Sequence, residues 1–203
     1  EFITMATDLA VSDCFSVLPP GAATPEHVAH LTSLTVVAAE AALRDQLTAT
    51  TPRHEPEHPD VTRARRAAGL DEGQAVAAAA IASTDPLVIV EGAAGSGKTT
   101  MLRTAITVAA EHGRVSRVVA PTKKAAQVAE EELGVPATSV AALVYAHGWR
   151  WNRDGVWTCL AVGDLDLDTG RNYTGPPKHA RLHRGERVIV DEAGMLDQDT
   201  ARA

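Results

Sequence analysis

The sequence predicts an α/β fold in which a parallel β-sheet carries helices on its faces. Short, continuously apolar segments such as LVIV, RVVA and RVIV have the composition of strands that are buried on both faces. Segments with helical spacing of apolar residues separate these strands along the chain. A glycine-rich loop follows the first apolar segment and leads into a helix, at the kind of strand end where open α/β sheets bind ligands.

Composition limits the class of protein before any motif is considered. With 203 residues, of which 45% are hydrophobic and 22% charged, the chain can bury one core with a small appendage. No apolar run approaches the roughly 18 residues of a membrane span, and no secretory signal is visible. The net charge of −7 argues against a generally basic nucleic-acid surface but leaves room for a local basic strip. Cys14 and Cys159 are far apart, which favours free thiols in a reducing cytoplasm.

The N-terminal third is expected to lie outside the core. We predict that residues 1–69 form a linker and an amphipathic helix, with residues 1–26 irregular. The helix is expected from Pro25 to about Ala49, where apolar residues recur at helical spacing. The ordered core is predicted to begin at Leu70 and to continue to residue 203.

Helices and strands are expected to alternate from Leu70 onward. Asp71 can cap a helix through Ser83, and the alanines of that helix favour close packing. Glycines are expected to end the later helices in the left-handed conformation. The remaining predicted elements are a strand at 87–90, a helix at Lys98–His112, a strand at 117–121, a helix at Lys123–Leu133, a short helix at 138–146 and a strand in the segment RVIVDEAG at 187–194 that ends in two acids.

An insertion at about residues 147–186 has a different character from the core. Its segment RWNRDGVWTCL predicts a β-hairpin that turns at Asp154 and Gly155. Five of the seven aromatic residues of the chain lie in or beside it. Aromatic side chains interleaved with arginines can stack on bases, worth about 1–3 kcal/mol for each base. The alternative is that the tryptophans form the hairpin's own core.

The glycine-rich loop predicts a phosphate-binding site because it matches the pattern G-x-x-x-x-G-K-[ST] in full. Glycines let the backbone N–H groups point at an anion, and the following helix adds its positive N-terminal end. Lysine can reach the phosphates, and the hydroxyl beside it can bind Mg²⁺. The residues expected to bind nucleotide here are Gly92, Ala93, Ala94, Gly95, Ser96, Gly97, Lys98, Thr99 and Thr100.

Two acidic residues follow the last apolar strand. Asp191 is expected to hold Mg²⁺, which takes few protein carboxylates and keeps several waters. Glu192 is expected to activate water for attack on a phosphate. Gln74 precedes the loop by about twenty residues, and its amide can pair with an adenine edge. Solvated caps for the two acids and a solvated glutamine are the alternatives.

Five segments carry a family resemblance. LDEGQ, GAAGSGKTT, APTKKAAQVAEEL, TSVAAL and VIVDEAGML occur in the order of the N-terminal helicase motifs of superfamily 1. Between Leu70 and Asp197 the chain resembles the RecD-like branch and the helicase portion of conjugative relaxases of the TraI/TrwC (MobF) type.

The resemblance implies a RecA-like P-loop ATPase domain that uses ATP and Mg²⁺ to move along single-stranded DNA. By position, Gln74 would contact adenine, Lys98 and Thr99 would bind phosphate and Mg²⁺, and Asp191 and Glu192 would drive hydrolysis. The residues that fall where the family touches the DNA backbone are Pro121, Thr122, Lys123, Thr138 and Ser139. Their alternative role is that of ordinary helix caps with a solvated lysine.

The family pattern also includes parts that this sequence does not contain. They are a Gly-Asp…Gln motif, a second RecA-like domain, an arginine finger, and a strand that inserts between the phosphate-loop strand and the acidic strand. We therefore expect a sheet that is incomplete toward the C-terminus, weak binding of Mg·ATP, slow hydrolysis and no unwinding by this segment without the rest of the helicase. A catalytically inactive nucleotide- and DNA-binding module and a small P-loop kinase are the other functions considered.

Overall fold

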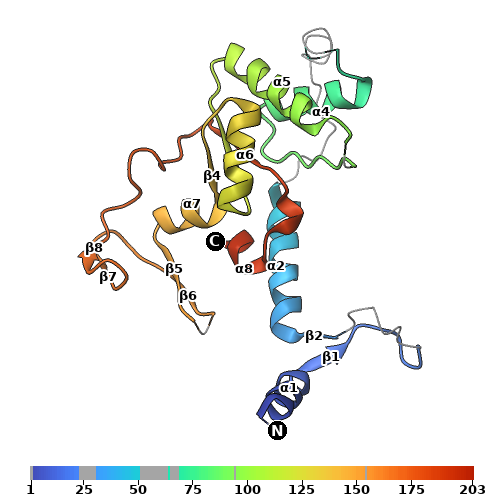
Figure 1. Ribbon diagram of the computed structural model, residues 1–203, viewed down its shortest axis with the longest axis vertical. Helices are drawn as coiled ribbons and strands as arrows, with labels where there is room; N and C mark the ends of the chain where they lie inside the picture. Colours follow the sequence, from blue (N-terminus) through green and yellow to red (C-terminus); the bar gives the residue numbers. More distant parts are fainter. Residues whose placement is uncertain (1, 23–30, 51–63, 65–68, 94, 154) are drawn as a thin grey trace. The chain divides into compact units, whose positions relative to one another are not determined.

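The computed structural model describes residues 2–22, 31–50, 64, 69–93, 95–153 and 155–203 (Figure 1). The chain divides into two compact units, one of residues 1–49 with Arg202 and one of residues 50–201 with Ala203, and each is described by itself. Predictions for residues 25–30, for Ala94 of the loop and for Asp154 of the hairpin turn lie outside the described residues.

The N-terminal unit contains more regular structure than predicted. Helix α1 spans Phe2–Ser12, and strand β1 (Cys14–Ser16) pairs antiparallel with β2 (Leu31–Ser33). The prediction that residues 1–26 are irregular is therefore wrong for these elements. The α1 segment contains neither proline nor glycine, so nothing in it opposes a helix. The strand β1 depends on a partner that lies well along the chain, which local sequence cannot reveal.

Helix α2 spans Leu34–Thr50, so it begins later than the predicted Pro25. Ala39 is its buried residue among those described, whereas Leu34, Val37 and Leu47 are 75%, 39% and 46% exposed. The apolar face that the sequence suggested is therefore largely uncovered. Among the described residues of the whole chain, no helix is both long enough and apolar enough to cross a membrane.

The second unit is built on the predicted parallel sheet. Strand β3 (Ser116–Ala120) lies at its centre, between β4 (Ala137–Ser139) and β9 (Arg187–Val190), and both neighbours run parallel to it. Val118 pairs with a residue of each neighbour, and it is fully buried. Because all three strands run in one direction, their carboxyl ends share one edge of the sheet. The α/β fold class is confirmed.

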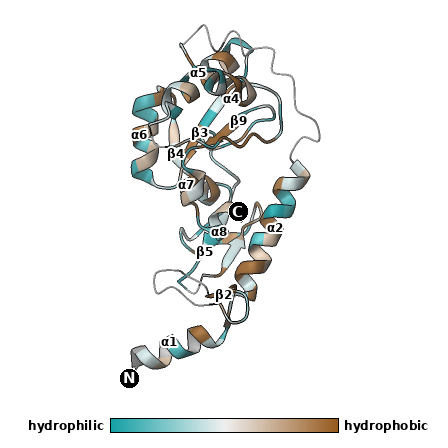
Figure 2. Cartoon of the chain, turned by 90° about the vertical axis from the view of Figure 1, so that its right-hand side faces the viewer, coloured by the Kyte–Doolittle hydropathy of each residue, from teal (hydrophilic) through white to brown (hydrophobic). Residues whose placement is uncertain are grey.

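Helices cover both faces of this sheet. The helices α4 (Glu72–Ala82), α5 (Lys98–Glu111) and α6 (Lys123–Leu133) contribute to a core cluster that includes Val118. Val119, the next residue of β3, points to the opposite face of the sheet and packs on α7 (Val140–Ala146). Much of α6 has the hydrophilic colour in Figure 2, as its lysines and glutamates require. These helices agree with the predicted ones within a few residues.

The predicted strand at residues 87–90 is not formed. Among the described residues this segment pairs with no strand, and β9 has a partner only on its β3 side. Val88 packs against the core, whereas Ile89 is 69% exposed and Val190 is 38% exposed. A strand requires hydrogen-bond partners from another segment, and in the described part of the chain residues 87–90 pair with no strand. The apolar composition of residues 87–90 thus correctly indicates that Val88 contacts the core, but the predicted strand is wrong.

The insertion forms two hairpins. The predicted one pairs β5 (Trp149–Trp151) with β6 (Trp157–Cys159), and a second one pairs β7 (Leu165–Asp166) with β8 (Arg171–Asn172). Trp149 and Trp157 pack against the α7 side of the domain core. The rings of Trp151 and Trp157 stack with centroids 4.8 Å apart.

Arg150 joins the two hairpins. Its guanidinium donates to the Asp166 carboxylate at 2.8 Å and lies 3.5 Å from the centre of the Tyr145 ring. Asp166 is 3% exposed. The hydrogen bond from Arg150 holds the pKa of Asp166 below its ordinary value of 3.8, at about 2.

This ion pair predicts an acid-sensitive step in the insertion. Because the pKa of Asp166 is depressed in the folded chain, the pair stabilises the fold above about pH 4 and loses this effect as the pH falls toward about 2. All three tryptophans of the chain lie in β5 and β6, so their emission reports on this region. Tryptophan emission should change between about pH 4 and pH 2, and Asp166→Asn should alter it already at neutral pH. An Asp199→Asn control outside the insertion should titrate as the parent chain does; an unchanged profile for Asp166→Asn would contradict the assignment.

Candidate functional site

The glycine-rich loop has the backbone that its glycines allow. Gly95 and Gly97 both have φ of 75°, in the left-handed region. At Gly92 an added Cβ would lie 2.8 Å from the Ser96 hydroxyl. Gly97 is the N-cap of α5 and provides no side-chain hydrogen bond to the first turn. The leading N–H groups of α5 are therefore available to an anion.

Lys98 is folded over this loop. Its ammonium donates to the carbonyl oxygens of Gly92 at 2.8 Å and Ala93 at 3.1 Å. An ammonium has three donors, so one of them lies outside these two bonds. Lys98 thus places a positive charge beside the loop, where a bound phosphate would contact both the lysine and the N-terminus of α5.

Gln74 connects the loop to α4. Its amide oxygen accepts from the Asp71 backbone at 3.0 Å, which completes a capping box at the start of α4. Its amide nitrogen donates to the Ser96 carbonyl at 2.9 Å. An added Cβ at Gly97 would lie 2.7 Å from this nitrogen. Gln74 therefore positions the loop, and its predicted contact with adenine remains a prediction.

Gln74→Glu separates the role of residue 74 in capping α4 from its role in holding the loop. Glutamate keeps the oxygen that accepts from Asp71 but has no N–H to donate to the Ser96 carbonyl. One lost hydrogen bond of about 0.5–1.5 kcal/mol predicts about 3- to 10-fold weaker nucleotide binding. The melting temperature should change little, since the cap is retained. Fluorescence titrations with adenine and guanine nucleotides test this prediction. Equal losses for both bases indicate a loop contact only, a larger loss for adenine supports base contact as well, and no loss refutes the prediction.

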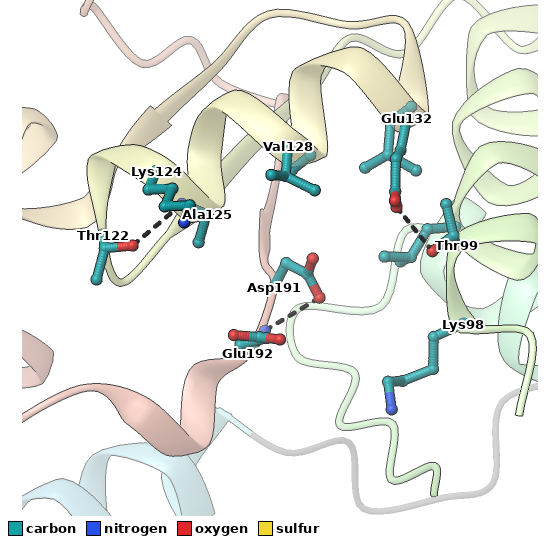
Figure 3. Close-up of a pocket in the computed structure, with 12 residues that line it drawn as sticks. Lys98, Thr99, Thr122, Lys124, Ala125, Val128, Glu132, Asp191 and Glu192 are labelled. Carbon is teal, nitrogen blue, oxygen red and sulfur yellow. Dashed lines mark hydrogen bonds between the residues drawn. The ribbon is translucent and has the colours of Figure 1, made fainter. Parts of the chain in front are cut away.

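The acidic pair lies at the carboxyl end of β9. The Asp191 backbone N–H donates to the Val119 carbonyl at 2.9 Å, and its carboxylate accepts from the Glu192 N–H at 3.0 Å. Glu192 has φ of 55°, and among the described non-glycine residues it is the one with positive φ. This conformation disfavours an L-residue by about 1–2 kcal/mol, and such strain tends to occur at functional sites. Since the chain turns sharply here, the two neighbouring carboxylates leave the strand in different directions (Figure 3).

The loop lysine and the acidic pair line one pocket of about 440 Å³ between α5, α6 and the end of β9. Figure 3 shows Asp191 between α6 and the loop. The sequence-predicted residues that line it are Lys98, Thr99, Thr122, Asp191 and Glu192. Sequence reasoning missed the polar residues Lys124 and Glu132. With Val128 they recur at every fourth position of α6, a spacing that could have indicated a common face.

The residues predicted to touch DNA lie near the carboxyl edge of the sheet. Thr122 and Ser139 are the N-caps of α6 and α7, where their hydroxyl oxygens accept from Ala125 at 3.1 Å and Ala142 at 3.2 Å. These contacts are the ones expected of ordinary caps. The others are the half-buried Pro121, the exposed Lys123 at the start of α6, and Thr138 in β4. Contact with DNA remains a prediction for all of them.

The donor set of the pocket suits Mg²⁺. Thr99 offers a hydroxyl and Asp191 a carboxylate, both oxygen ligands of the hard type that Mg²⁺ prefers. No cluster of three or more His, Cys, Asp or Glu side chains able to hold a metal occurs in the part of the chain that the structure describes. Mg²⁺ usually takes few protein ligands and completes its coordination with phosphate and water.

Comparisons with known proteins agree with this geometry. A family model described as an AAA domain matches residues 69–203, which is more than half of the chain. The match covers the loop, the sheet, the pocket and the insertion. No curated protein matches the chain.

Proposed function

The chain belongs to the AAA-domain family of P-loop NTPases, and on that premise we propose that residues 69–203 bind Mg·ATP as the ATPase domain of a helicase on single-stranded DNA. The observation that carries the proposal is the single pocket lined by Lys98, Thr99, Asp191 and Glu192. Phosphate binding and water activation require these groups together, and they come from two segments that are far apart in the sequence.

Each residue has a role that its surroundings support. The N–H groups at the start of α5 and the Lys98 ammonium bind the phosphates. Thr99 and Asp191 hold Mg²⁺, which neutralises phosphate charge when bound. Glu192, turned away from Asp191, orients a water and accepts its proton.

The positively charged residues of the pocket bear on the rate of ATP hydrolysis that we propose for this segment. Among the described residues the positively charged side chains that line it are Lys98 and Lys124, with no arginine. An arginine that reaches a transferring phosphoryl group can contribute about 10³–10⁵ in rate. We therefore propose that the segment binds nucleotide but hydrolyses it slowly until a partner domain supplies such a group.

The DNA role rests on the resemblance and on position. Thr122, which the motif order assigns to the DNA backbone, also lines the nucleotide pocket. A DNA contact at the start of α6 would therefore lie beside the phosphates, which is what coupling between ATP and DNA requires. We further propose that the parent protein is a conjugative relaxase-helicase that acts in the cytoplasm. The order of the sequence motifs supports this extension.

Binding measurements test this function. A fluorescent ATP analogue should bind in the presence of Mg²⁺ and more weakly with EDTA. Labelled single-stranded DNA should bind with an affinity that depends on the nucleotide, as followed by anisotropy. Equal DNA affinity with and without nucleotide would favour the inactive module, and transfer of phosphate to a small acceptor would favour a kinase. Failure of the analogue to bind at all would refute the proposal.

A further inference from the structure

One carboxylate of the pocket has a contact that no motif predicts. The Thr99 hydroxyl donates a hydrogen bond to Glu132 Oε2 at 3.1 Å. Thr99 lies in the first turn of α5, and Glu132 lies in the last turn of α6. Figure 3 shows the two side chains pointing toward one another across the pocket.

Glu132 is held to α5 by a second contact. Arg103, one turn after Thr99, donates from Nε to the Glu132 carbonyl oxygen at 3.1 Å, and its Nη2 donates to the same oxygen. Residues four apart lie on one face of a helix, so Thr99 and Arg103 reach Glu132 from the same side. The side chain and the backbone of Glu132 are thus both engaged by α5.

The direction of the hydrogen bond matters for a metal. A threonine hydroxyl has one proton and two lone pairs. When the proton points to a carboxylate, both lone pairs remain for a cation. In the structure this proton goes to Glu132, while the Asp191 carboxylate accepts from the Glu192 backbone N–H. With its proton donated to Glu132, the Thr99 hydroxyl keeps its lone pairs for a cation.

We propose that Glu132 is a positioning residue for the Mg²⁺ ligand Thr99. The inference rests on the proposed function, since it assumes that the pocket takes Mg²⁺ with a nucleotide. Groups that orient a metal ligand in this way typically change metal affinity about 10- to 100-fold when they are removed.

The test is the Mg²⁺ dependence of nucleotide binding. Glu132→Leu removes the acceptor, and we expect the half-saturating Mg²⁺ concentration for the fluorescent ATP analogue to rise about 10-fold or more. Binding of the analogue in EDTA should be no weaker than in the parent chain, because the substitution removes a negative charge from the pocket. Glu132→Gln keeps an uncharged acceptor and should show a smaller rise, because hydrogen bonds to charged groups are about twice as strong. Glu130→Gln, an exposed neighbour outside the pocket, is the matched control and should match the parent chain.

A double-mutant cycle distinguishes positioning from a general effect on structure. In a Thr99→Ala background there is no hydroxyl to orient, so Glu132→Leu should produce no further rise. An equal rise in both backgrounds, or an unchanged or lower Mg²⁺ requirement in Glu132→Leu, would overturn the inference while leaving nucleotide binding intact. Absence of nucleotide binding in the parent chain would instead overturn the proposed function, and the inference with it.

Discussion

Replacing Lys98 with alanine is expected to weaken binding of the ATP analogue by about 10- to 100-fold. Charge-assisted hydrogen bonds contribute about 1.5–3 kcal/mol each. The substitution removes at least one such bond to a phosphate, which corresponds to the stated loss of affinity. The substitution also removes the bonds to the Gly92 and Ala93 carbonyls that hold the loop. The phosphate contacts exist only in the bound state, whereas the two carbonyl bonds also hold the free loop, so a small loss of stability should accompany a larger loss of affinity.

Fluorescence titration and thermal melting measure these two quantities on the same samples. Lys178→Ala is the matched control, since this exposed lysine lies in the insertion and does not line the pocket. The control should bind the analogue like the parent chain. Parent-like affinity in Lys98→Ala would mean that the nucleotide does not bind at this loop.

Glu192→Gln should give the second large effect, on hydrolysis and not on binding. An amide cannot accept a proton from water, and loss of a positioned general base lowers rates by about 10²–10⁴-fold. Because Glu192 is exposed and outside the α5 terminus, the affinity for the analogue should change less than about threefold. The result would be a chain that holds ATP without consuming it.

Single-turnover hydrolysis with radiolabelled ATP and single-stranded DNA is the appropriate assay for the slow hydrolysis that we propose. Glu130→Gln again serves as the control, with the parent rate expected. If Glu192→Gln hydrolysed ATP as fast as the parent chain, the role of this residue as a base would be refuted. Unimpaired phosphate transfer to a small acceptor by the same variant would point to a kinase.

The helices of the core could be predicted because their signals are local. Asp71 and Thr122 cap their own helices, and Gly134 with φ of 71° ends α6. Each of these effects depends on residues within one or two turns. The phosphate loop belongs to the same class, since its backbone follows from its own glycines.

The features that the sequence did not predict depend on contacts with residues far away in the chain. LVIV has the composition of a strand but lacks a neighbour, whereas the three residues of β4 form one because β3 lies beside them. Three residues are too few for any periodicity to be visible. The approach of Glu132 to Thr99 likewise joins residues 33 apart, and only the packing of α5 on α6 brings them together. The positive φ of Glu192 could not be anticipated either, because glutamate rarely adopts it.

That backbone conformation at Glu192 has an evolutionary consequence. A glycine at this position would avoid a steric penalty of about 1–2 kcal/mol, partly offset by the greater freedom of glycine in the unfolded chain. A substitution that relieves this strain would therefore remove the general base that we propose. If Glu192 serves only hydrolysis, relatives of this chain that do not hydrolyse ATP are expected to carry glycine or asparagine at this position.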